Sequence, residues 1–390
     1  MADAPAAAAA LGKTQTVKPP AQKQKFHAYP FWSPRFWHGM RFGDWMRLCI
    51  KHRFRIHPIR WPMAFLISLI TPFNSVMGAI QRWRYGKQID ETPIDPPPVF
   101  ILGHWRSGTT YLHELMYLDD RFVTPTTYQC FAPLHFLLTE WLMVRLGGWL
   151  LPRHRPMDNV LAGWDRPQED EFALIELDSP TPYFRMAFPN DPPPHMELLD
   201  MEGVAPEDLA RFEKAIVSFV KSIAFQNPKR VLLKSPPHTG RVATLSRLFP
   251  GARFIHIVRH PDALFPSTMR LWKSLDEVQG LQMPRGKGMR EYVFSCFERM
   301  YGGFEKQRRT IDERTVIDIK YEDLVADPVG QLERIYRELG LGDFEPLRAK
   351  LTEYVAAQKS YKTNVHELDD ETRAELRRRW AGYFVRYEYE

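Results

Sequence analysis

The segment GHWRSGTT, residues 103–110, carries the most specific chemical signal in this sequence. Gly103 and Gly108 have the spacing of the ATP-binding loop G-x-x-x-x-G-K-[ST], and Thr110 fits its last position. Thr109, however, stands where that loop has its lysine. Because this lysine normally reaches the β- and γ-phosphates, its absence argues against a nucleoside triphosphate. Arg106 instead puts a cation before the second glycine, which is enough for a ligand with a single terminal phosphate.

A glycine loop between a strand and a helix binds phosphate through its backbone N–H groups and the positive end of the helix. Here the apolar run PPPVFILG precedes the loop, and the helical pattern TTYLHELMYL follows it. Ser107, Thr109 and Thr110 add hydroxyl donors. The alternative is a loop that merely turns tightly, and the strand and helix around it disfavour that interpretation.

Four apolar runs predict the strands that would position such a loop. They are PPPVFILG at 96–103, RVLLK at 230–234, RFIHIVR at 253–259 and TVIDIKY at 315–321. Helical patterns follow the first three runs, at 109–118, 238–249 and 262–272. Strands that alternate with helices predict an α/β fold with a parallel sheet. The runs lack polar alternation, which is typical of strands covered on both faces.

Several motifs together resemble a known family. RSGTT after an apolar strand resembles the 5′-phosphosulfate loop of the sulfotransferases that use 3′-phosphoadenylyl sulfate (PAPS). Residues 232–272 resemble the 3′-phosphate module of that superfamily, particularly its bacterial and tyrosylprotein branches. Residues 320–341 resemble the strand, loop and helix that follow, and KSYKTN at 359–364 stands where the family's late basic loop closes over the nucleotide. The resemblance covers about residues 96–390.

The resemblance implies a P-loop sulfotransferase fold, in which helices flank a central parallel sheet, and PAPS as co-substrate. In the family, a strand-end arginine and a serine eight residues later bind the 3′-phosphate, and Arg259 and Ser267 match that spacing. A loop for one phosphate and an arginine for the other suit PAPS, which carries charge at both ends of an adenosine. The implied donor-binding residues are Arg106, Ser107, Gly108, Thr109, Thr110, Arg259, Ser267, Tyr321 and Lys362.

The resemblance further implies an in-line transfer to a hydroxyl or amine, with no metal and with release of adenosine 3′,5′-bisphosphate. Lys234 matches the active-site lysine of the tyrosylprotein branch, and we expect it and Arg106 near the bridging oxygen. The acceptor must also lose a proton to a base. The tyrosylprotein branch's base does not carry over, and neither does its substrate, because Thr126 and Thr127 stand at that position.

Two candidates for the base stay open. One is His238, four residues after Lys234, and the other is Glu169 in the segment RPQEDEF. Asp170 and Glu171 follow Glu169 directly, and similar acidic segments are characteristic of bacterial relatives. Three consecutive acids cannot all face one pocket, so we expect one or two of them to bind arginines or cap a helix.

The N-terminal region predicts a tail and then a basic arm. Residues 1–25 lack an apolar signal segment, and their Ala-, Lys- and Pro-rich composition predicts a disordered tail. Residues 26–95 mix aromatic and basic side chains. Residues 1–60 hold eleven Lys or Arg and two Asp, a net charge of +9, whereas the whole chain carries +6. This asymmetry favours an anionic partner such as a membrane surface. Nucleic acid is the alternative, and the uncharged stretch that follows fits lipid better.

That uncharged stretch, WPMAFLISLITPFNSVMGAI at residues 61–80, leaves three interpretations open. It can form buried or substrate-lining helices, a helix in the plane of the membrane interface, or a true span, for which its length just suffices. Its two prolines, Asn74 and its hydroxyl-bearing residues dilute its hydrophobicity and argue against the span. Trp61 and Trp83 bracket the stretch like interfacial anchors.

Residues 119–228 lie between the first two predicted strands and are expected to build the acceptor pocket. Within them, the Leu-rich residues 129–152 read either as core helix or as an apolar tunnel open to a membrane. An apolar tunnel, together with the basic arm, favours a lipid or other amphipathic alcohol as acceptor. A carbohydrate or peptide acceptor remains an alternative. The cysteines Cys49, Cys130 and Cys296 are isolated, which disfavours a zinc site and suits a reducing, cytoplasmic location.

Two rival functions are weaker. A nucleotide kinase or NTPase needs the loop lysine and a metal-binding acid on a neighbouring strand, and the sequence shows neither. A non-catalytic membrane adaptor would not need the intact set Arg106, Lys234, Arg259 and Ser267. The sequence therefore predicts a PAPS-dependent sulfotransferase of the cytoplasm, peripheral at the membrane. It leaves the acceptor, the base and the oligomeric state open, and a homo-oligomer is compatible with it.

Overall fold

The structure is a computed structural model that describes residue 29 and residues 32–151, 163–357 and 368–390. Its centre is a parallel sheet of five strands in the order β2-β3-β1-β4-β5. The strands are β1 (Val99–Leu102), β2 (Phe122–Val123), β3 (Arg230–Lys234), β4 (Arg253–Val258) and β5 (Val316–Lys320). The four strands predicted from the sequence are thus confirmed. The very short edge strand β2 adds a fifth, and two residues are too few to show any periodicity.

Alternate strand residues belong to two separate apolar cores, one on each face of the sheet. In β1, Phe100 and Leu102 point into the larger core, whereas Val99 and Ile101 point into the smaller one. This explains the continuous apolar runs, because both faces of each strand are covered. In register, Ile101 lies beside Lys234 of β3, and Leu102 lies beside His256 of β4. The loop after β1 therefore lies between the ends of β3 and β4.

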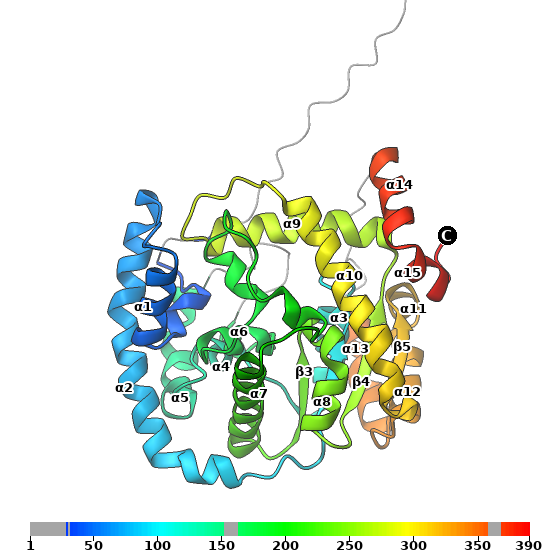
Figure 1. Cartoon of the computed structure of the whole chain (residues 1–390). Helices are drawn as coiled ribbons and strands as arrows, with labels where there is room; N and C mark the ends of the chain where they lie inside the picture. The colour runs from blue at the N-terminus through cyan, green and yellow to red at the C-terminus, as the bar shows by residue number, and fades with distance from the viewer. Residues whose placement is uncertain (1–28, 30–31, 152–162, 358–367) are drawn as a thin grey trace, which may run out of the picture.

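Helices cover both faces of the sheet (Figure 1). The smaller core takes side chains from α3 (Thr109–Tyr117), α11 (Tyr321–Ala326), α12 (Pro328–Leu339) and α13 (Glu345–Ala357). The larger core takes them from α7 (Pro206–Gln226), α8 (Val242–Leu248), α9 (Pro261–Gln279), α10 (Met289–Gln307), α14 (Asp370–Arg379) and α15 (Ala381–Arg386). The helix expected at 238–249 instead begins with the 3₁₀ turn η6 (Pro236–Arg241), which ends in a kink because Gly240 has non-helical φ and ψ of −88° and 15°.

The predicted N-terminal arm packs into the larger core. Its elements are η1 (Phe36–Gly39), α1 (Phe42–Lys51) and α2 (Trp61–Glu91), and α2 continues well past the stretch 61–80. Trp37 and Trp45 are almost fully buried in that core, and so is Ile67 on the inner face of α2. The predicted tail, residues 1–25, lies outside the described residues.

The segment 129–152 does not form a core helix, which corrects one sequence interpretation. It folds into the end of α4 (Thr127–Phe131), then α5 (Phe136–Leu146) and the 3₁₀ turn η3 (Gly148–Leu150). Phe136 is the one residue of α5 that is buried. The helix is apolar nearly all round but lies at the surface, and Trp141, Leu142, Val144 and Leu146 are exposed.

Candidate active site

The glycine loop after β1 adopts the backbone conformation that its composition predicts. Gly103 and Gly108 have φ values of +142° and +103°, a region open mainly to glycine. A Cβ on Gly108 would also lie 2.2 Å from the ring of Tyr321. Arg106 has φ +70°. Gly108 therefore needs to be a glycine, because the Tyr321 ring packs directly against its backbone. Gly108 is also the N-cap of α3.

A phosphate fits this loop. The Ser107 hydroxyl is fully buried at the start of α3, and none of the described residues hydrogen-bonds to its oxygen. The first N–H groups of α3, from Thr109 and Thr110, have no partner within the helix by position. A buried hydroxyl beside a helix N-terminus is the donor set that an anion needs.

The donor residues predicted after β4 meet the loop. The Arg106 guanidinium donates from Nε to the Ser267 hydroxyl at 2.9 Å. Arg259 donates to the Arg106 carbonyl at 2.9 Å and stacks over the Tyr321 ring at 4.4 Å. The structure thus gathers two arginines, a hydroxyl and an aromatic ring on the β4 side of the loop. Arg106 thus contacts Ser267, another predicted donor-binding residue, while its expected place near the bridging oxygen stays a prediction. Lys362 lies outside the described residues.

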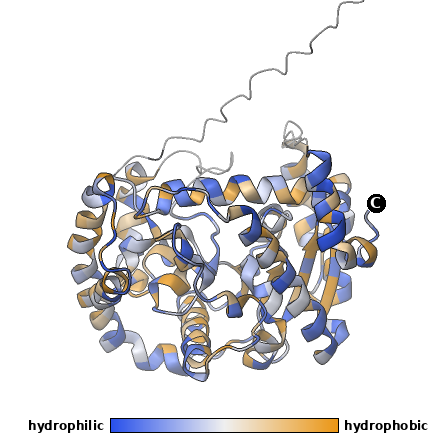
Figure 2. Cartoon of the chain, turned by 45° about the horizontal axis from the view of Figure 1, so that its top comes forward, coloured by the Kyte–Doolittle hydropathy of each residue, from blue (hydrophilic) through white to orange (hydrophobic). Residues whose placement is uncertain are grey.

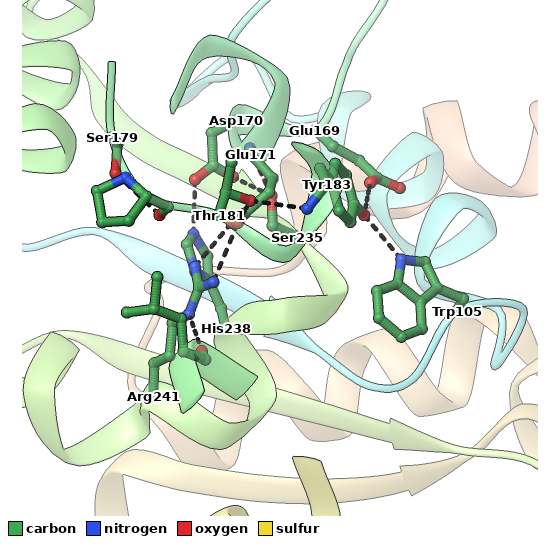
Figure 3. A network of polar contacts seen from close by, with 12 residues as sticks. Trp105, Glu169, Asp170, Glu171, Ser179, Thr181, Tyr183, Ser235, His238 and Arg241 are labelled. Atoms are coloured by element: carbon green, nitrogen blue, oxygen red, sulfur yellow. Dashed lines mark hydrogen bonds and ion pairs between the residues drawn. The ribbon is translucent and has the colours of Figure 1, made fainter. Parts of the chain in front are cut away.

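A second cluster lies on the β3 side of the loop. Lys234, the last residue of β3, donates to Glu169 Oε1 at 2.8 Å. Tyr183 donates its hydroxyl proton to Glu169 Oε2 at 2.8 Å and accepts from Trp105 Nε1 at 2.7 Å (Figure 3). The Lys234 side chain is 2% exposed and that of Glu169 is 16% exposed. Trp105 belongs to the glycine loop, so this chain of contacts connects the loop to an ionisable pair.

Directly behind this cluster lies a fully buried polar layer (Figure 3). His238 contacts Asp170 at 2.6 Å, and Arg241 binds Glu171 through two nitrogens at 2.7 and 3.0 Å. Ser235 donates to Asp170 at 2.8 Å. The expectation that the three acids would separate is confirmed, since Glu171 binds an arginine and Asp170 binds His238. Glu169, the N-cap of α6 (Asp170–Glu176), is the one acid of the three that reaches solvent.

Electrostatics reinforce this arrangement. Burial, and then the carboxylates of Glu169 and Glu171, hold the pKa of Tyr183 well above its ordinary value, so its hydroxyl stays protonated and donates. Burial acts to raise the pKa of Asp170, but His238 and the Ser235 hydroxyl outweigh it and lower that pKa. Asp170 is therefore a fixed negative charge that orients His238.

Tyr183 is a site residue that sequence reasoning missed. It lies in η4 (Pro182–Met186), fourteen residues after Glu169, and no motif marks it. The only available signal is its place in the segment SPTPYF, where a tyrosine is an ordinary core residue. The tertiary fold brings it to Glu169.

Comparisons with known proteins show the family of this chain. A family model described as "Sulfotransferase family" matches residues 97–346. The chain belongs to the sulfotransferase family. It is 43% identical over 359 residues to the omega-hydroxy-beta-dihydromenaquinone-9 sulfotransferase Stf3 of Mycobacterium bovis, covering 92% of each chain. The Mycobacterium tuberculosis protein of the same name gives the same values.

Solved structures support the fold of this sulfotransferase. Sulfotransferase STF9 from Mycobacterium avium matches with a TM-score of 0.62 at 17% identity, over 90% of this chain and 97% of its own. Sulfotransferase STF1 from Mycobacterium tuberculosis matches with a TM-score of 0.60 at 17% identity, over 87% and 92%. At this identity the likeness speaks for the fold alone.

Proposed function

We propose that this sulfotransferase moves the sulfuryl group of PAPS onto the hydroxyl of a lipid and releases adenosine 3′,5′-bisphosphate. The observation that carries the proposal is the Lys234–Glu169 pair, 2.8 Å apart, at the carboxyl end of β3 beside the glycine loop. Open parallel sheets bind ligands at this edge. The pair supplies a cation and a base where a loop-bound phosphosulfate would present its sulfur.

The donor would be held from both sides of β1. Ser107 and the N–H groups from Gly108 to Thr110 suit the 5′-phosphate, because they combine a buried hydroxyl with a helix N-terminus. Arg259, Arg106 and Ser267 suit the 3′-phosphate, since two guanidinium groups and a hydroxyl meet there. Tyr321, whose ring lies under Arg259, would position that arginine. Lys362 is proposed as a further donor ligand from the family resemblance.

Glu169 is the base that we favour over His238. It is partly exposed, whereas His238 is fully buried and occupied by Asp170. In the transfer, the acceptor hydroxyl gives its proton to Glu169 as its oxygen bonds to sulfur. The bond from sulfur to the bridging phosphate oxygen breaks, and Lys234 stabilises the charge left on that oxygen. The products are a sulfate ester, the bisphosphate and a protonated Glu169.

A lipid acceptor is proposed from two sources. The Stf3 relatives, by name, act on a hydroxylated menaquinone-derived lipid, and this chain covers 92% of their length. Its own surface is unusually apolar around α2 and α5. A lipid acceptor also fits a cytoplasmic enzyme that is peripheral at an anionic membrane.

Titration calorimetry with adenosine 3′,5′-bisphosphate, and with ATP plus Mg²⁺, tests the donor. We expect the bisphosphate to bind and Arg259→Ala to weaken it by at least about tenfold, because a charge-assisted contact is lost. Arg314→Ala, an exposed arginine outside the proposed site, is the matched control. Binding of ATP plus Mg²⁺ alone would reject the donor assignment and favour the kinase alternative.

Turnover of ω-hydroxy-β-dihydromenaquinone-9 dispersed in detergent tests the chemistry. We expect Glu169→Gln to lower kcat by about 10²–10⁴-fold while the bisphosphate still binds. Lys234→Ala should mainly lower kcat as well. Normal turnover by Glu169→Gln would show that the base has been assigned wrongly.

A further inference from the structure

The outer face of α2 is a continuous apolar stripe. At helical spacing along it lie the exposed side chains of Trp61, Phe65, Leu69, Phe73, Val76, Ile80 and Trp83. Phe65 is 68% exposed and Trp83 is 85% exposed. The stripe extends over the 23 residues from Trp61 to Trp83, so its ends lie about 33 Å apart. Single exposed apolar residues are normal on a soluble protein, but a stripe of this length marks a binding surface.

A second apolar surface comes from a distant part of the sequence. Along α5, Trp141, Leu142, Val144 and Leu146 are exposed, and Trp149 of η3 is 72% exposed. The polar face that an ordinary surface helix turns to water is nearly absent here. In Figure 2, orange segments recur along the helices at the edge of the molecule where α2 lies.

The two surfaces adjoin. The backbone N–H of Leu137, in the first turn of α5, donates to Gln81 of α2 at 2.9 Å. His135 lies 3.2 Å from the Asn74 amide oxygen, and its ring meets that of Phe73 edge-on. Figure 1 likewise shows α5 directly beside α2. Helices from residues 61–91 and 136–146 thus make one side of the molecule.

A bilayer is the occupant that fits this side. No charged residue occurs between Arg60 and Arg82. Basic residues precede the stripe (Lys51, Arg53, Arg55 and Arg60) and α5 carries Arg145, whereas after the stripe Arg82 and Lys87 pair with Asp90 and Glu91. Apolar anchors with tryptophans and flanking cations match an anionic interface. A second copy of the protein would not account for the excess of basic over acidic residues before the stripe.

The helix α2 is long and apolar enough to cross a membrane, by length and composition. Its inner face, however, is held to the body along its whole length. Ile67 is buried in the larger core, Asn74 donates to the His38 and Met40 carbonyls at 2.5 and 3.0 Å, and Tyr85 packs on Phe225 of α7. A span would break all these contacts, so the helix is placed to lie in the interface plane.

A short series of hydrogen bonds connects α5 to Glu169. Glu140 of α5 accepts from the Thr126 hydroxyl at 3.0 Å. The backbone of residues 125–127 pairs with that of 166–168, for example through Gln168 N–H to the Pro125 carbonyl at 2.9 Å. The residue after Gln168 is Glu169 itself. Only this short pairing separates α5 from the proposed base.

We propose that the outer faces of α2, α5 and η3 form one docking surface that seats the enzyme in the plane of an anionic bilayer and presents the acceptor hydroxyl to Glu169. The delivery step rests on the lipid acceptor proposed above, whereas the seating does not. Both α2 and the α5–η3 segment contribute to this surface, so the N-terminal arm alone is not sufficient for membrane binding.

Sedimentation with vesicles of phosphatidylcholine and phosphatidylglycerol, without substrate, tests the seating. Two double variants of the full chain remove anchors: Phe65→Glu with Leu69→Glu on α2, and Trp141→Glu with Leu146→Glu on α5. We expect each to lower partitioning by at least about tenfold. The matched control is Val325→Glu with Val385→Glu, two exposed apolar positions on α11 and α15 at the opposite edge of the molecule (Figure 1).

Bisphosphate binding by each variant verifies its fold. If the α5 variant sediments like the wild type, the composite surface is refuted. A wild-type dimer in light scattering that the α5 variant converts to monomers would also overturn the proposal, because the occupant would then be a second copy.

Turnover separates this inference from the proposed function. With acceptor in vesicles, both anchor variants should lose activity, and with acceptor in detergent micelles they should match the wild type. Equal activity of all variants on vesicles would refute delivery through this surface. If the wild type does not turn over the acceptor in micelles, the proposed function is refuted. The sedimentation result then still tests whether the surface binds the bilayer.

Discussion

At the scale of residues, three consecutive acids take three different tasks. Glu169 keeps solvent access with Lys234 on one oxygen and Tyr183 on the other, while Asp170 and Glu171 are buried against His238 and Arg241. The need for such a division follows from charge repulsion and could be predicted. Which acid stays accessible depends on how α6 sits against β3 and η6, and local sequence carries no such information.

The first prediction concerns Tyr183. Tyr183→Phe keeps the ring but removes the donor to Glu169 and the acceptor for Trp105. We expect kcat to fall by about tenfold, the scale of one charge-assisted hydrogen bond, with bisphosphate affinity unchanged. Steady-state kinetics with calorimetry measures both. An equal loss in Tyr292→Phe, another buried tyrosine, would show that the effect is only structural.

The second prediction concerns Glu176, which is fully buried at the other end of α6. The backbone of Gly39 lies beside its carboxyl group and lowers its pKa, but burial outweighs this contact. Burial, with a further contribution from Asp44, raises its pKa well above the ordinary value. The folded state thus holds a proton that the unfolded chain releases above about pH 4.3, so wild-type stability falls as the pH rises.

Glu176→Gln removes this penalty. We expect a higher unfolding midpoint than wild type at pH 8, by a free-energy difference that grows by up to about 1.4 kcal/mol per pH unit and vanishes near pH 4. Calorimetric or fluorescence melts over this range measure it. Glu353→Gln, at an exposed position, should show no such trend. A constant difference at every pH would contradict the assignment of a proton to Glu176.

At the scale of elements, the strand–loop–helix unit could be predicted almost in full, because its glycines and apolar strand are local signals. The third prediction is that Gly108→Ala weakens bisphosphate binding by at least about tenfold, since φ +103° and the Tyr321 ring both oppose a Cβ. Gly203→Ala has a similar φ of +72° without any near neighbour and is the matched control. Calorimetry compares the two, and equal binding by both variants would contradict the close-packed loop.

The orientation of α2 and α5 could not be predicted in the same way. Both segments are apolar nearly all round, so periodicity does not tell the buried face from the exposed one. Polar residues decide it through tertiary contacts, with Asn74 and Gln81 reaching the turn after η1 and the start of α5. Such partners are distant in sequence, which is why the sequence leaves 129–152 open between a core helix and an apolar tunnel.

At the scale of the whole molecule, the N-terminal region is part of the larger core. Phe36 stacks on Phe172 and Trp37 stacks on Phe184, both from residues 119–228, and Trp45 is buried in the same core. The sequence predicted an arm because its charge is set apart. The region is buried because its aromatic side chains pack into the core. Their partners lie more than a hundred residues away in the sequence, so local patterns do not reveal this packing.

The fourth prediction follows from this packing. Removing residues 1–95 should leave a chain that is insoluble or lacks a cooperative melt, because the deletion strips several fully buried aromatic side chains from the core. Removing residues 1–25, the predicted tail, should leave the unfolding midpoint unchanged. Circular dichroism melts of the two truncated proteins measure the unfolding midpoints. A well-folded 96–390 fragment would contradict a core that the N-terminal region shares with the rest of the chain.

The buried layer behind Glu169 has a consequence for how this enzyme can evolve. Removing one partner of a buried ion pair leaves an uncompensated charge and costs about 3–5 kcal/mol, whereas replacing both together is often tolerated. Asp170 with His238 and Glu171 with Arg241 should therefore behave as epistatic couples. Single-site scanning would mark all four as intolerant, while paired libraries would recover functional combinations. Lineages can cross between such combinations only through rare double changes, so the wall of the active site diverges more slowly than the surface that faces the acceptor.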